Sequence, residues 1–303
     1  MKFNLKYTLL VILMTLSISS CYKERPLKVE DVKDKYNALT DDPSDTCKHA
    51  AYNFYQDFGH VLIYNPTIAD YKFNFKGDNG IKIIAPDQDK ETFRAGMKFL
   101  HKALIDVYDK EFLRKNLPFS VILAKVVKMA SYGETKEMRS YASGSFLAIG
   151  GITKDLDKLS NEEFNKMRAS FNADLWGNYM SSVRGIFKVN PNFYKVSEMV
   201  SRHIYNPNGY RLGSEDPSGI NYYNYGLISY STSKSIIEKD TDFYQIYAPD
   251  KREDLQQWIE FIFATPEDEI QRITTQYQAM ELKYKILKES MLEYGFDITK
   301  IKK

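Results

Sequence analysis

The sequence predicts an α+β fold, with a small sheet in the first half and helices dominating the second. Hydrophobic residues make up 43% of the 303 residues, and 23 Tyr and 18 Phe give ample material for a core. Most short apolar or alternating runs, which are typical of strands, fall before residue 152. Long runs with helical spacing follow residue 160, and no repeat or change in composition marks a boundary. We therefore expect one globular domain.

The N-terminal segment is typical of a signal peptide. Lys2 and Lys6 precede an almost wholly apolar run over residues 7–18, which is too short to span a bilayer. The Ile-Ser-Ser-Cys sequence that follows matches a lipobox, in which Cys21 receives the lipid. The alternative is an ordinary signal peptide followed by an unrelated cysteine. The expected organisation is a lipoprotein signal peptide (1–20), a tether (21–46) and a globular domain (47–303).

Charge and cysteine content exclude several classes of protein. Removing residues 1–20 removes two lysines and no acid, which leaves 40 basic and 40 acidic residues. A balanced charge gives no electrostatic reason to bind nucleic acid. With Cys21 lipidated, Cys47 alone remains, so an internal disulfide is excluded. We expect Cys47 to be a packed side chain rather than a reactive thiol.

The first half contains most of the strand candidates. The apolar run 61–64 predicts a short buried strand. Tyr71, Phe73 and Phe75 alternate with polar residues and precede a Gly-Asp-Asn-Gly turn, which predicts a β-hairpin with the segment 81–84. The other elements expected here are helices over residues 29–39, 44–58 and 90–108 and strands over residues 119–127 and 140–152.

The second half contains mainly helices. Ser160 and Glu163 form a capping box that begins one of them. The last carries eight apolar side chains spaced three and four residues apart from Ile270 to Tyr294, so we expect one continuous helix that docks this face. Residues 205–230 mix Tyr with Asn, Gly and Pro and predict a long ordered loop. The expected helices cover residues 160–183, 192–203, 240–247, 250–263 and 266–294.

Local motifs indicate no catalytic group, metal or cofactor. The four histidines include no pair four residues apart, and His-Glu-x-x-His is absent. Ser145 does not lie in a Gly-x-Ser-x-Gly sequence, and Gly150-Gly151 lacks the remainder of a phosphate loop. A carboxylate pair for glycoside hydrolysis stays open, because such partners can lie far apart in the chain.

The Tyr- and Asn-rich segment 205–230 is a candidate binding surface. Tyrosine rings can cover the CH faces of a sugar, and Asn amides can bond to hydroxyl or peptide groups. The alternative is an aromatic loop that packs on its own domain.

Four features of the sequence together resemble one known family. They are the lipobox, the Phe-Gly-His-Val-Leu-Ile-Tyr segment at 58–64, residues 99–119 ending in Leu-Pro-Phe, and the acidic-led final helix ending in Tyr-Gly-Phe at 294–296. They are similar to Bacteroidota surface lipoproteins described as zinc-binding metallopeptidases, whose domains are gluzincin-like. The resemblance runs over most of the mature chain. It implies a zincin-like single domain that is lipid-anchored in the outer membrane and exposed at the cell surface.

The resemblance also shows what this chain lacks. The family's zinc helix corresponds to residues 174–178 or 178–182, and neither register supplies a histidine. A later ligand glutamate corresponds to Gln245. Asp, Asn, Ser and Gln are a poor donor set for zinc. The resemblance thus implies a scaffold that has lost its ligands, with degenerate positions at Asp174, Asn178, Ser182 and Gln245.

We expect a non-catalytic lipoprotein that binds a glycan, a peptide or a partner protein in a surface nutrient-capture system. One alternative is an active zinc metallopeptidase with a rearranged site, which requires His203 near Asp242 or Glu238. A third interpretation is a hydrolase with two acids about 5–10 Å apart in one cleft. The resemblance places the binding cleft between the helix around Trp176 and the Tyr-rich loop. Its expected residues are Trp176, Tyr179, Tyr205, Tyr210, Tyr222, Tyr223 and Tyr225.

Overall fold

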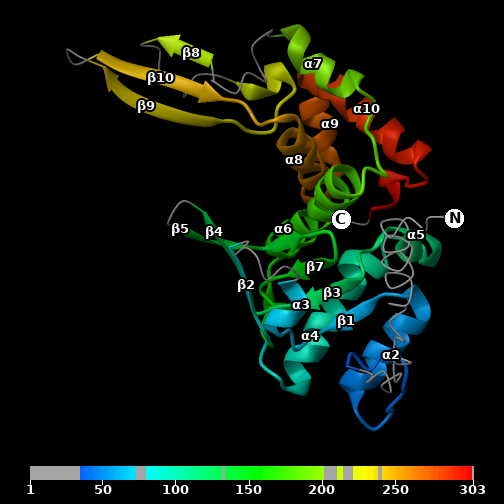
Figure 1. Ribbon diagram of the computed structural model, residues 1–303. Helices are drawn as coiled ribbons and strands as arrows, with labels where there is room; N and C mark the ends of the chain where they lie inside the picture. Colours follow the sequence, from blue (N-terminus) through cyan, green and yellow to red (C-terminus); the bar gives the residue numbers. More distant parts are fainter. Residues whose placement is uncertain are drawn as a thin grey trace, which may run out of the picture. The chain divides into compact units, whose positions relative to one another are not determined.

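The computed structural model describes residues 35–72, 80–131, 134–200, 210–213, 221–237 and 241–301 (Figure 1). The chain separates into the units Met1–Lys35 and Tyr36–Lys303, and the second contains every described helix and strand. The expected signal peptide and the lipidation site Cys21 lie outside the described residues, as do Tyr205, His203 and Glu238. No described helix is both long enough and apolar enough to cross a membrane.

A four-stranded sheet organises the first half of the domain. Its order is β1 (Val61–Ile63), β3 (Ser120–Leu123), β7 (Phe146–Ile149) and β6 (Ser140–Ala142). The first three strands are parallel and β6 runs antiparallel to β7. Every residue of β1, β3 and β7 is buried, which explains why all of them except Ser120 are apolar. The strand predicted at 61–64 is confirmed, whereas each of the runs 119–127 and 140–152 contributes to two strands instead of one.

The second sheet corrects the predicted hairpin. It consists of β2 (Ile81–Ile84), β4 (Val126–Ser131) and β5 (Glu134–Met138), all antiparallel, with β4 in the middle. Strand β2 thus pairs with the distant strand β4, and Tyr71 belongs to a helix rather than to a hairpin strand. Tyr71 is the last residue of the short helix α3 (Ile68–Tyr71), which begins at a capping box in which Asp70 accepts hydrogen bonds from Thr67. Phe73 and Phe75 lie outside the described residues.

The helices of the first half begin at acidic caps. Helix α2 (Thr46–Phe58) is capped by Asp45 and ends at Gly59, whose φ of +74° lies in the left-handed region. Helix α4 (Lys90–Leu100) continues into a π-helical turn, His101–Ile105, and α5 (Lys110–Asn116) follows. The predicted helices at 44–58 and 90–108 are confirmed. In the segment 29–39, the described residues form turns and bends rather than a helix.

Three helices and a π-helix cover the centre of the second half. The capping box of Ser160 and Glu163 begins α6 (Asn161–Ala173), which continues as the π-helix η3 (Asp174–Val183). Helices α7 (Asn192–Val200) and α8 (Lys251–Ala264) follow, and α8 packs against both α6 and η3.

The predicted final helix is two helices rather than one. Tyr277 has φ −124° and ψ 109°, and this extended residue separates α9 (Glu267–Gln276) from α10 (Gln278–Glu293). Tertiary contacts hold the break, because the Tyr277 ring packs 5.4 Å from that of Tyr223 and its hydroxyl accepts a hydrogen bond from Asn221. The docking face itself is confirmed. Its fully buried members are Ile270, Ile273, Met280, Leu287 and Met291.

A third sheet replaces the helix predicted at 240–247. Strand β10 (Thr241–Tyr247) pairs residue for residue with β9 (Ser231–Ile237) and also with β8 (Tyr210–Gly213). The run Phe-Tyr-Gln-Ile-Tyr is rich in aromatic and β-branched residues, which favour strands when a partner is present. The expected loop 205–230 therefore contains a strand, and also a 3-10 turn at Tyr222–Tyr225.

The core confirms the α+β class and places the helices around one aromatic cluster. Trp176 on η3 is fully buried, and its indole nitrogen donates to the Tyr108 hydroxyl at 2.8 Å. Phe187, Tyr294 and Phe296 surround the same indole. The last of these rings follows α10, so the chain's final helix and η3 share one core.

Candidate functional site

Asp174 is the first residue of the π-helix η3, and its carboxyl group is buried. The residue is 7% exposed. Its Oδ2 accepts a 2.6 Å hydrogen bond from the Ser140 hydroxyl on β6, and its Oδ1 accepts a 3.2 Å bond from Gln256 Nε2 on α8. Segments separated by 34 and 82 residues in the chain thus meet at one carboxyl group.

Gly177 allows α8 to come this close to η3. A Cβ at position 177 would lie 2.6 Å from Gln256 Cγ and 3.2 Å from its Cα. No side chain fits in that space without moving the backbone of α8. The glycine therefore holds Gln256 within reach of Asp174.

Burial changes the acidity of two carboxyl groups here. It raises the pKa of Asp174 to about 6, and the negative charge of Glu260 adds to this effect while the bond from Ser140 opposes it. Burial also raises the pKa of Glu260, with Arg139 acting in the opposite direction. Paired carboxyl groups with raised pKa values are more common at functional sites than elsewhere.

These groups line a pocket of about 360 Å³ between β5, β6, η3 and α8. Gln257 also lines it, and its buried Oε1 has no hydrogen-bond partner among the described residues. A neighbouring hollow of about 570 Å³ shares residues 137–139 with this pocket. The charged residues of the pocket are Lys136, Glu137, Arg139, Asp174, Glu253 and Glu260.

Asn178, Ser182 and Gln245 are the other positions where the resemblance implies lost zinc ligands. Asn178 donates its amide to Ala142 O at 3.2 Å, and Ser182 donates its hydroxyl to Gly177 O at 3.0 Å. Gln245 lies in β10 opposite Ser233. Within the described part of the chain, no three His, Cys, Asp or Glu side chains are grouped as a metal ion would require. The side chains near η3 therefore do not fit a zinc site.

The aromatic residues expected to line a cleft have other roles. Trp176 and Tyr179 are 0% and 2% exposed, so they cannot contact a ligand in this conformation. The Tyr223 ring lies 4.8 Å from that of Tyr222 and also packs on Tyr277.

The turn that contains Tyr222 and Tyr223 therefore packs largely on its own domain. This agrees with the alternative to a binding surface for this segment, an aromatic loop packed on its own domain. Tyr225 is partly buried in the same turn, and Tyr210 lies in β8.

Among the described residues, His49, His60 and Cys47 form no catalytic pair with one another. His49 bonds to Asp41 at the surface, and burial lowers the pKa of His60. Burial raises the pKa of the Cys47 thiol, and Asp45 adds to the effect.

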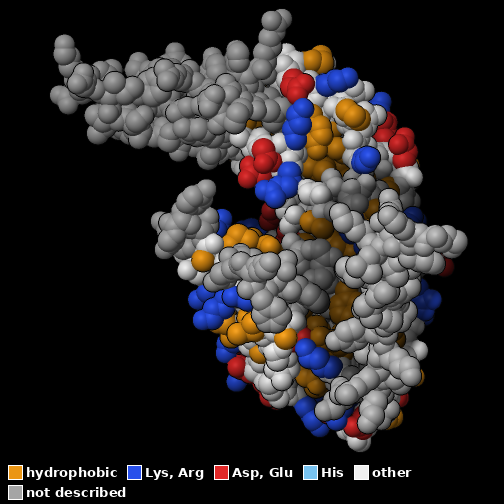
Figure 2. Space-filling view, viewed as in Figure 1, with side chains coloured by type: hydrophobic (Ala, Val, Ile, Leu, Met, Phe, Trp, Pro, Cys, Tyr) orange, Lys and Arg blue, Asp and Glu red, His pale blue; other side chains and the backbone are white. Residues whose placement is uncertain are grey.

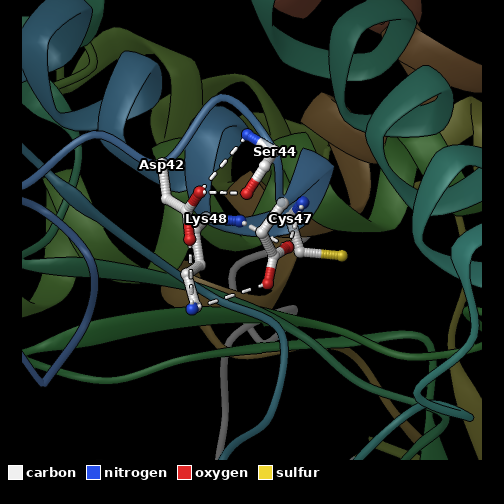
Figure 3. Close-up of polar contacts among 5 residues, drawn as sticks. Asp42, Ser44, Cys47 and Lys48 are labelled. Carbon is white, nitrogen blue, oxygen red and sulfur yellow. Dashed lines mark hydrogen bonds and ion pairs between the residues drawn. The ribbon is translucent and has the colours of Figure 1, made fainter.

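Figure 3 shows the polar contacts beside Cys47, in which Asp42 binds Ser44 and Lys48 while the Cys47 sulfur points away from them. The thiol is thus not activated by a neighbouring base.

Basic and acidic side chains are interspersed over the described part of the face in Figure 2. This mixture agrees with the balanced charge of the sequence and gives no extended basic surface for nucleic acid on that face.

No family model and no curated protein matches this chain. Among solved structures, it is similar to one described as a putative zinc-binding metallo-peptidase from Bacteroides caccae. The two share 12% sequence identity and a TM-score of 0.42, over 82% of this chain and 85% of the other. A likeness of this strength does not assign the chain to a family or an activity.

Proposed function

We propose that this chain is a lipid-anchored, non-catalytic binding protein of the outer membrane, and that its ligand site is the pocket at Asp174. The observation that carries the proposal is the buried Asp174 carboxyl group, which is held by Ser140 and Gln256 and lines a pocket of about 360 Å³. The sequence resemblance places this residue where a peptidase would hold zinc. Hydrogen-bonding side chains stand there instead of imidazoles.

The pocket favours a ligand that donates hydrogen bonds. Four of its lining side chains are carboxyl groups, against the two cations Lys136 and Arg139, and the buried Gln257 Oε1 atom is a further acceptor. Sugar hydroxyl groups or the ammonium group of a peptide supply such donors. Strand β5 pairs on one side only among the described residues, so its other edge can bond to an extended peptide.

Glycan and peptide arrays test this proposal directly. The ligand that binds best is then titrated into the wild type and the Glu260→Gln variant. We expect a loss of about tenfold in affinity, because one hydrogen bond to a charged acceptor is removed. Glu281→Gln is the control, since this exposed acid on α10 does not line the pocket. Equal affinity for all three proteins would contradict the assignment of the pocket.

A second candidate function is acid–base hydrolysis of a glycan. Asp174 and Glu260 line one pocket, the Glu260 charge acts on Asp174, and both pKa values are raised. It predicts sugar release from a polysaccharide with a bell-shaped pH profile, abolished by Glu260→Gln. Binding without any turnover favours the non-catalytic function.

A further inference from the structure

A second pocket of about 330 Å³ shares no lining residue with the Asp174 pocket. It lies between α4 with its π-helical turn, the 3-10 turn Leu156–Lys158 and the start of α6. Packing of α4 against the 3-10 turn, and of α6 against the π-helical turn, forms its walls. Nothing in the proposed function uses this pocket.

The pocket carries more positive than negative charge. Lys98, Lys102 and Arg168 line it, and Asp157 is the one acidic residue among its lining residues. Lys98 Nζ already pairs with Asp157 at 2.7 Å. Lys102 is exposed and makes no ion pair with a described residue, so its charge is available to a ligand.

The cations surround an aromatic wall. The Phe164 ring lies 5.8 Å from Lys102 Nζ and 5.9 Å from the Arg168 guanidinium carbon. The edge of Phe99 supports this ring at 5.3 Å, and the Asn165 amide stands beside it in the pocket wall. Arg168 is 3% exposed and donates to Phe263 O at 3.1 Å, so its position is fixed.

We propose that this pocket binds a small ligand that combines a carboxylate with a ring that has an apolar CH face, such as an acidic sugar unit. The exposed Lys102 ammonium group matches the carboxylate, Phe164 matches a CH face of the ring, and Asn165 can bond to a hydroxyl group. The buried Arg168 adds positive charge behind the pocket wall. A simple anion would not use the aromatic wall, and a neutral sugar would not use the cations. The proposal does not depend on the Asp174 pocket.

Calorimetric titration of the whole chain with D-glucuronate, D-glucose and inorganic phosphate tests the proposal. We expect glucuronate to bind more tightly than either of the other two, and its affinity to fall as salt is added. Equal binding of glucose would remove the role of the cations. Equal binding of phosphate would remove the role of the ring. Either result, or no glucuronate binding, would overturn the proposal.

Variants of Lys102 identify the pocket. Lys102→Gln should weaken glucuronate binding by about tenfold, and Lys102→Arg should keep most of the affinity because the charge is retained. Lys285→Gln is the matched control, since Lys285 is exposed on α10 and outside the pocket. Unchanged affinity in Lys102→Gln would place any glucuronate site elsewhere and overturn the proposal. An exposed lysine can be replaced without loss of the fold.

Discussion

Asp174 is held at a cost in stability. Its pKa is raised from 3.8 to about 6, so the folded protein binds its proton more tightly than the unfolded chain does. Between these two pH values the free energy of unfolding falls as pH rises, and above pH 6 the full penalty remains. The penalty is about 3 kcal/mol at pH 7. A destabilising carboxyl group in a pocket is more readily explained by function than by packing.

The Asp174→Asn variant tests this reading. Asparagine carries no charge and can still accept from Gln256, while its amide can donate to Ser140 Oγ. We expect a higher free energy of unfolding than the wild type at pH 8, by up to about 3 kcal/mol, and little difference at pH 4. Urea unfolding at both pH values measures this. A variant that is less stable at both would show that the charge itself supports the fold.

Lys283 and Asp254 form a buried ion pair with a different role. Lys283 Nζ lies 2.5 Å from Asp254 Oδ2, and both side chains are 0% exposed. The same ammonium group donates to Ser197 Oγ and stands 4.2 Å from the centre of the Phe193 ring. Burial lowers the pKa of Lys283, and the Asp254 charge opposes this. Asp254 lies on α8 and Lys283 on α10, so the pair joins these two helices.

Removing one partner of this ion pair should lower the free energy of unfolding much more than removing both partners does. Lys283→Met removes the ammonium group that lies against the buried Asp254 carboxylate, and we expect a loss of about 3–5 kcal/mol in the free energy of unfolding. Lys283→Met combined with Asp254→Leu should recover most of that loss. Denaturant unfolding measures both losses. Tryptophan fluorescence can monitor it, since the centre of the Trp258 ring lies 5.7 Å from Lys283 Nζ. A double variant as unstable as the single one would contradict this account.

At the scale of elements, the crossing of η3 and α8 builds the site. Gly177 permits that crossing, because a Cβ there would meet Gln256 at 2.6 Å. Alanine normally stabilises a helix relative to glycine by about 1 kcal/mol. Here we expect Gly177→Ala to destabilise the protein by about 1–3 kcal/mol through overpacking.

Thermal unfolding measures this effect against a matched glycine. Gly144→Ala is the control, because its Cβ would meet only Val183 at an ordinary 3.7 Å. We expect a lower Tm for Gly177→Ala and little change for Gly144→Ala. A Gly177→Ala protein as stable as the wild type would mean that α8 and η3 can separate at little cost.

Several elements could be predicted because local signals define them. The capping box at Ser160 and the apolar run at Val61–Ile63 each fix an element without help from distant residues. The break at Tyr277 could not be predicted, since it depends on Asn221 and Tyr223. Strand β10 is a strand because it pairs with β9, and residues 240–247 alone give no sign of that partner. The helix predicted there is therefore wrong.

For the whole molecule, the sequence could predict one residue of the candidate site but not its surroundings. The resemblance pointed to Asp174, yet Ser140, Gln256 and Glu260 come from distant segments with no shared motif. The same limit explains why Trp176 and Tyr179 were expected in a binding cleft although they lie in the core. Their aromatic character fits a binding cleft or a core equally well, and only tertiary packing shows that they are buried.

For the whole molecule, the central proposal is that the chain binds no zinc at the positions where its sequence resembles a metallopeptidase. Zinc content of the purified chain from Tyr22 to Lys303, after incubation with zinc and extensive dialysis, tests this most directly. We expect well-folded protein with far less than one zinc per chain. Stoichiometric zinc, together with peptidase activity that a chelator abolishes, would contradict the claim and support the active metallopeptidase.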